Sequence, residues 1–99
     1  MKVSVLEIKD MGMGNLRAYA TLLIGPLIIY RAKLIKQPGQ KAYVSPPQFE
    51  YFANDRMNYT PVIKWPEEWK TPIFEAVWAA YDAQRQQKSE EIASTFNID

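Results

Sequence analysis

The feature that most constrains the fold is a pair of apolar segments, residues 16–24 and 27–36, which are joined by only Gly25-Pro26. Side chains of a strand point alternately to opposite faces, and the first segment shows this alternation. One face would carry Leu16, Ala18, Ala20, Leu22 and Ile24, and the other Arg17, Tyr19, Thr21 and Leu23. Because Gly-Pro is a turn signal, the pattern predicts two antiparallel strands connected by a tight turn.

The tip of this hairpin is apolar on both faces. With a two-residue turn, Leu22 lies opposite Ile29 and Leu23 lies opposite Ile28. One helix covers only one face of a small sheet, and contiguous exposed apolar patches usually mark interaction sites. We therefore expect a homodimer with Leu22, Leu23, Ile28 and Ile29 in its interface. The alternative is that residues 48–58 fold over the second face.

Three further strands are expected around the hairpin. Residues 3–9 are rich in β-branched and apolar side chains. Residues 41–45 form a strand that Pro46-Pro47 ends, because proline cannot donate to a ladder. A fifth strand is expected at residues 59–65, where Pro61 would confine it to an edge of the sheet.

The stretch between the fourth and fifth strands, residues 48–58, has the least regular pattern. Asn54-Asp55 marks a turn. Phe49, Tyr51 and Phe52 either form a helical turn or anchor a loop.

A helix is predicted after Thr71-Pro72, which combines a good N-cap residue with a favoured first helical residue. It carries a wide apolar stripe at helical spacing, formed by Ile73, Phe74, Val77, Trp78 and Tyr81. We expect it to end near Gln87 and residues 88–99 to form a polar tail or one weak helical turn. The chain is thus predicted to be one α+β domain, residues 1–87. It would be a small antiparallel β-sheet of four to five strands with a C-terminal α-helix packed on one face.

The composition argues against most catalytic chemistry. The 99 residues include no histidine and no cysteine. This removes the usual general base near neutral pH, thiolate nucleophiles and the commonest zinc ligands. No motif places a serine beside an activating base, and nothing in the sequence places two carboxylates together in a pocket. We therefore expect no enzyme, no cofactor and no metal site.

The sequence indicates a cytoplasmic protein without membrane contact. Its N-terminus lacks the apolar core of a signal peptide. The most apolar stretch, residues 22–30, is shorter than the roughly 20 residues that span a bilayer. The net charge of +1 gives no overall attraction to nucleic acid, so such binding requires a local patch.

Such a patch is expected on the third strand. Arg31 and Lys33 alternate onto one face, with Lys36, Lys41 and Arg56 at its margin. Strand cations commonly form only a solvated face. The other interpretation is a phosphate-contacting surface, doubled by dimer symmetry, that binds DNA or RNA weakly and with low sequence specificity. Six aromatic residues that follow in the chain either stack on bases or form the core beneath a long loop. They are Phe49, Tyr51, Phe52, Tyr59, Trp65 and Trp69.

Several segments also match a known pattern in order and spacing. They are Arg17-Ala18-x-Ala20, Ala42-Tyr43-Val44-Ser45-Pro46, Ile63-Lys64-Trp65-Pro66 and, most closely, Glu75-Ala76-Val77-Trp78-Ala79-Ala80-Tyr81. In this order they resemble the SpoVG family, named for stage V sporulation protein G and also called septation protein. The similarity covers residues 3–81.

The resemblance implies a homodimeric bacterial or phage-borne regulator that binds DNA or RNA and affects cell division, sporulation or gene expression. Lys33 matches a position that the family often fills with arginine. After its proline, the family continues with serine and a basic pair, where this chain has Pro47-Gln48-Phe49-Glu50. The alternative function is a protein-interaction adaptor of the same fold, in which the aromatic loop of residues 48–59 binds a partner protein.

Overall fold

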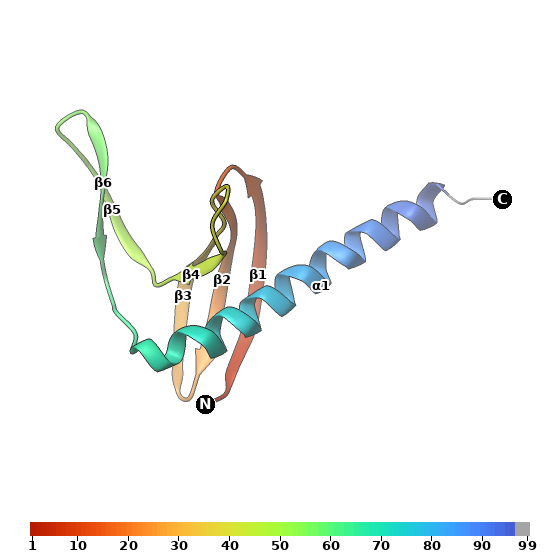
Figure 1. Ribbon diagram of the computed structural model, residues 1–99, viewed down its shortest axis with the longest axis horizontal. Coiled ribbons are helices and arrows are strands. Elements are labelled where there is room, and N and C mark those ends of the chain that lie inside the picture. The colour runs from red at the N-terminus through yellow and green to blue at the C-terminus, as the bar shows by residue number, and fades with distance from the viewer. Residues whose placement is uncertain (97–99) are drawn as a thin grey trace.

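The computed structural model describes residues 1–96, with the side chains of all of these except Met13 and residues 88–96. Four antiparallel strands form a sheet in chain order: β1 (Val3–Met13), β2 (Leu16–Ile24), β3 (Leu27–Ile35) and β4 (Tyr43–Ser45). A separate two-stranded sheet consists of β5 (Gln48–Ala53) and β6 (Arg56–Pro61), and the turn η1 (Glu67–Trp69) leads into α1 (Lys70–Phe96). Figure 1 shows α1 crossing one face of the four-stranded sheet, here termed the inner face. The predicted α+β class is confirmed.

The central hairpin has the register that the sequence predicts. Leu22 pairs with Ile29, and Leu23 pairs with Ile28. Gly25 has a φ of 57°, in the left-handed region that glycine adopts without steric cost. Glycine at the first central position is the preference of the type II′ turn, whose twist matches that of the flanking strands.

A bulge in β3 decides which of its residues face α1. The pairs on either side of the bulge are Ala20 with Ala32 and Leu22 with Ile29. Between these pairs β2 has one residue, whereas β3 has two, Tyr30 and Arg31. Arg31 adopts a φ of 63°, which is uncommon for a residue other than glycine and typical of a bulge. In a regular strand, residues three apart point to opposite faces. Because of the extra residue, Ile29 and Ala32 both point to the inner face.

The hydrophobic core lies between the inner face and α1. Its largest fully buried side chains are those of Leu22, Leu34, Ile73 and Val77. Tyr81 is also buried, whereas Trp78 is 39% exposed, with its ring centroid 5.9 Å from that of Phe74. The predicted helical stripe is therefore confirmed at its centre, and Trp78 forms its exposed margin.

The helix is longer than the sequence predicts. It begins at Lys70, so Thr71 lies inside its first turn and is not the N-cap. It continues to Phe96, so the expected end near Gln87 is wrong, and the residues expected to form a tail are helical as far as Phe96. Residues 84–91, which span the expected end, are Gln, Arg, Lys or Glu except for one Ser, and these four residue types have good helix propensity. Residues 97–99 of the expected tail lie outside the described residues.

Four strand boundaries differ from expectation, and the smallest change is that β3 ends at Ile35 rather than at residue 36. β1 extends to Met13 rather than Lys9, and β4 covers only Tyr43–Ser45. The strand expected at residues 59–65 is confirmed only as far as Pro61, because β6 covers Arg56–Pro61. Residues 62–66 instead lead the chain back to η1, and Trp65 in this segment is buried in the core.

Within residues 1–96, no helix is both long enough and apolar enough to cross a lipid bilayer.

Candidate interaction site

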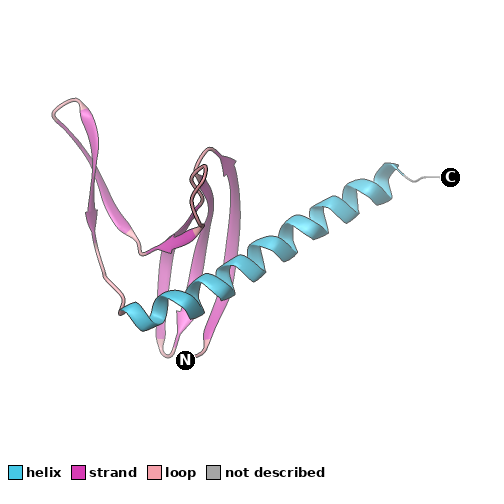
Figure 2. Ribbon diagram, viewed as in Figure 1, coloured by secondary structure: helices cyan, strands magenta, loops and turns pink. Residues whose placement is uncertain are grey.

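Residues 48–61 form a hairpin, here termed the arm, that projects away from the four-stranded sheet (Figures 1 and 2). The expectation of a loop or helical turn at residues 48–58 is wrong, because β5 and β6 pair from Gln48 with Pro61 to Ala53 with Arg56. A two-residue turn between two aromatic, alternating segments is a hairpin signal, and this signal was present in the sequence.

The turn of the arm lies at Asn54-Asp55, as predicted. The two residues have φ values of 54° and 61°. Positive φ at both central positions is the requirement of the type I′ turn that favours two-residue hairpins, and Asn and Asp tolerate it well. The side-chain amide of Asn58 donates to the carbonyls of Ala53 and Arg56, each at 3.1 Å. These bonds hold the end of the arm together.

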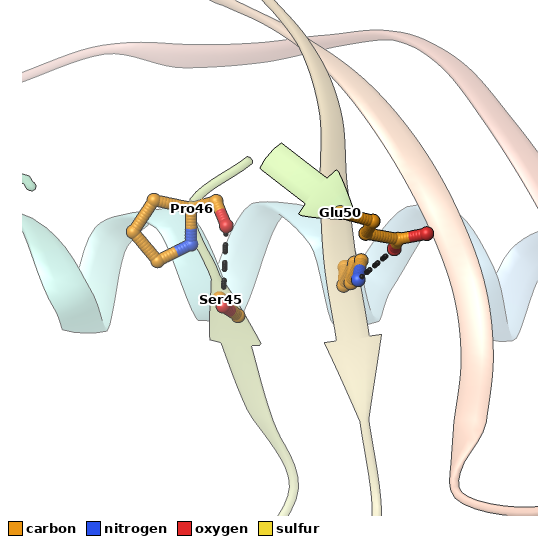
Figure 3. A network of polar contacts seen from close by, with 4 residues as sticks. Ser45, Pro46 and Glu50 are labelled. Atoms are coloured by element: carbon orange, nitrogen blue, oxygen red, sulfur yellow. Dashed lines mark hydrogen bonds and ion pairs between the residues drawn. The ribbon is translucent and has the colours of Figure 1, made fainter. Parts of the chain in front are cut away.

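One lysine attaches the base of the arm to the outer face of the four-stranded sheet, which is the face opposite α1. Lys33 Nζ lies 2.8 Å from Glu50 Oε1, a contact drawn as the dashed line at Glu50 in Figure 3. The same Nζ lies 5.2 Å from the centre of the Tyr59 ring. Glu50 and Tyr59 are cross-strand partners, so one cation contacts both strands of the arm. The hydrogen bond from Lys33, with its positive charge, lowers the pKa of the Glu50 carboxyl below its ordinary value of 4.5.

Both faces of the arm expose large apolar side chains. On one face Phe49 and Tyr51 stack with ring centroids 6.1 Å apart. On the other face Phe52 pairs with Met57, next to Glu50 and Tyr59. Phe49 is 62% exposed and Phe52 is 69% exposed, and the remaining three apolar side chains are also exposed. The expectation that this aromatic segment covers the second face of the sheet is therefore met only at the arm's base.

The predicted basic residues do not form one patch. Lys33 is only 9% exposed and is paired with Glu50, so the expectation that it offers a free charge is wrong. Arg31 is exposed, and its guanidinium carbon lies 4.6 Å from the centre of the Tyr19 ring. Lys36 donates to the carbonyls of Gln37 and Gln40 in the β3–β4 connection.

The other two predicted cations are elsewhere. Lys41 is exposed just before β4, and Arg56 is exposed next to the turn of the arm. Sequence alternation correctly placed Arg31 and Lys33 on one face, but it could not show that the arm would neutralise one of them.

The four residues expected in a dimer interface separate into two groups. Leu22 and Ile29 are in the core beneath α1, so the expectation that they contact a second chain is wrong. Leu23 and Ile28 point to the outer face, where Ile28 is 50% exposed and Leu23 is half-buried. The homodimer stays a prediction, now confined to Leu23 and Ile28.

No group of three or more acidic side chains is placed to hold a metal ion in the part of the chain that the structure describes. Comparison with protein-family models, curated proteins and solved structures finds no match to this chain. The resemblance to the SpoVG family therefore stays a prediction that rests on its quoted segments.

Proposed function

We propose that the chain is a non-enzymatic interaction module that binds a partner protein through the arm. The observation that carries this proposal is the exposure of five large apolar side chains on one projecting hairpin. They are Phe49, Tyr51, Phe52, Met57 and Tyr59.

The physical reason is that the arm lacks a core of its own. An isolated two-stranded hairpin is marginally stable in water, and this arm contacts the sheet through Lys33 at Glu50 and Tyr59. Aromatic and methionine side chains are enriched at protein interfaces, and buried aromatic side chains supply much of the binding energy there. A partner that covers the arm would remove its apolar surface from water and fix its conformation.

The second candidate is the homodimeric, SpoVG-like regulator that binds DNA or RNA. Arg31 favours it, because this exposed guanidinium is oriented by contact with Tyr19 and is available for a phosphate. Against it, Lys33 is paired with Glu50 and the other cations are dispersed. A patch that neutralises few phosphates binds nucleic acid weakly. The arm is therefore the better supported site.

Site-specific photocrosslinking tests the proposal. A benzophenone amino acid would replace Phe52 in the arm or, as a control, Tyr30, an aromatic residue of similar exposure outside the arm. In the cells that express the protein, we expect adducts to a distinct protein from position 52 and not from position 30. Adducts only at twice the chain mass, adducts to nucleic acid, or equal adducts from both positions would contradict the proposal.

A further inference from the structure

A groove lies along the last strand of the four-stranded sheet. One wall is β4 with Pro46, and the other is formed by residues 64–67 and Lys70, where the chain enters α1. The hollow has a volume of about 670 Å³. A second hollow of about 370 Å³ continues along β4 toward Phe74 and shares Tyr43, Val44 and Lys70 with the first. We term the two together the β4 groove.

The backbone of β4 offers an open hydrogen-bonding edge to this groove. Within residues 1–96, β4 pairs with β3 on one side and has no strand on the other. Alternate N–H and C=O groups of an edge strand point away from its neighbour, and they can pair with an added strand. Pro46 and Pro47 end β4, so an added strand would be limited to a short length.

The side chains of the groove supply two further features that peptide recognition needs, namely apolar walls and a positive charge. Val44, Pro46 and Trp65 give it apolar walls. At its rim Lys70 is paired with Glu67 at 2.7 Å, whereas Lys64 is exposed and has no ion-pair partner among the described side chains. The groove therefore combines apolar walls with one uncompensated positive charge, which is complementary to a carboxylate.

We propose that the β4 groove binds an extended peptide segment of another protein by strand addition to β4, with an acidic side chain of the peptide at Lys64. In this mode main-chain hydrogen bonds provide affinity, and pockets for alternate side chains provide specificity. The proposal goes beyond the function of the arm and does not rest on it, because no residue of the arm lines the groove.

Selection from a random peptide library displayed on phage, with the whole chain as bait, tests this site. We expect enriched peptides to carry Asp or Glu at a fixed position and to lack proline in the binding stretch. A synthetic enriched peptide should lose affinity about tenfold or more for Lys64→Glu, because a charge-assisted contact is replaced by repulsion. Lys2→Glu makes the same charge change at an exposed residue outside the groove and should leave affinity unchanged.

Methylation of the peptide backbone tests strand addition without altering the protein. Methylating alternate peptide nitrogens that face β4 should abolish binding, whereas methylating the intervening nitrogens should be tolerated. The proposal is overturned if no peptide is enriched, if Lys64→Glu binds as tightly as wild type, or if both methylated series bind. Loss of peptide binding in Phe52→Ser would also overturn it, because the peptide would then occupy the arm.

Discussion

Lys33 Nζ on β3 lies 2.8 Å from Glu50 Oε1 on β5, and this ion pair joins the arm to the sheet. The lysine is nearly buried, whereas the glutamate is exposed. The contact gives a structural role to a lysine that the sequence alone assigned to nucleic acid, and it leads to the first two predictions.

Acidification should weaken the attachment of the arm. The pKa of Glu50 is lowered in the folded chain by its hydrogen bond to Lys33. A carboxyl with a depressed folded pKa stabilises the fold above its ordinary pKa, and this contribution is lost as pH falls through the folded value. The difference in unfolding free energy between wild type and Glu50→Gln should therefore be largest at neutral pH and should disappear well below pH 4.5. Denaturant titrations at a series of pH values measure it, and a difference that is independent of pH would contradict the prediction.

Nucleic-acid binding, if the chain has it, should depend on Arg31 more than on Lys33. Arg31→Ala removes an exposed guanidinium and should reduce the slope of log affinity against log salt by about 1. Lys33→Ala should leave the slope unchanged, since this charge is already paired with Glu50. Anisotropy titrations with short mixed-sequence DNA and RNA measure both slopes. If wild type binds neither probe at low salt, the regulator hypothesis fails.

Self-association should depend on the outer face of the hairpin tip. Sedimentation of wild type is expected to give twice the chain mass, and Ile28→Asp is expected to give a folded monomer, because an unpaired charge is costly to bury. Leu22→Ala instead creates a cavity under α1 and should reduce the unfolding free energy by about 2–5 kcal/mol. A wild-type chain that stays monomeric at high concentration would refute the dimer.

The buried stripe of α1 can be tested by a pair of substitutions. Val77→Ala removes fully buried methyl groups and should cost about 1–3 kcal/mol of unfolding free energy, scaled down from larger aliphatic truncations. Ala79→Glu lies on the exposed side and should cost less than about 0.5 kcal/mol. Chemical denaturation of both variants compares the costs, and the reverse order would mean that a different face of α1 packs on the sheet.

Much of the fold follows from local patterns in the sequence. The register between Leu22 and Ile29 depends on a two-residue turn and on alternation, and both are visible in neighbouring residues. The core positions Ile73 and Val77 follow from helical spacing. The same local reasoning missed the arm, because the aromatic residues of β5 suited a loop anchor as well as a strand.

The amino-acid sequence by itself determined the class of fold, the central hairpin and the apolar stripe of the helix, since each of these follows from a pattern among neighbouring residues. Only the tertiary structure decided that Leu22 is in the core while Leu23 faces outward, because alternation defines two faces and does not say which one a distant helix will cover. It also decided the state of Lys33, whose partner Glu50 lies 17 residues away on a separate hairpin. Whether a charge is free or paired depends on which segments meet in space, and that information is not local.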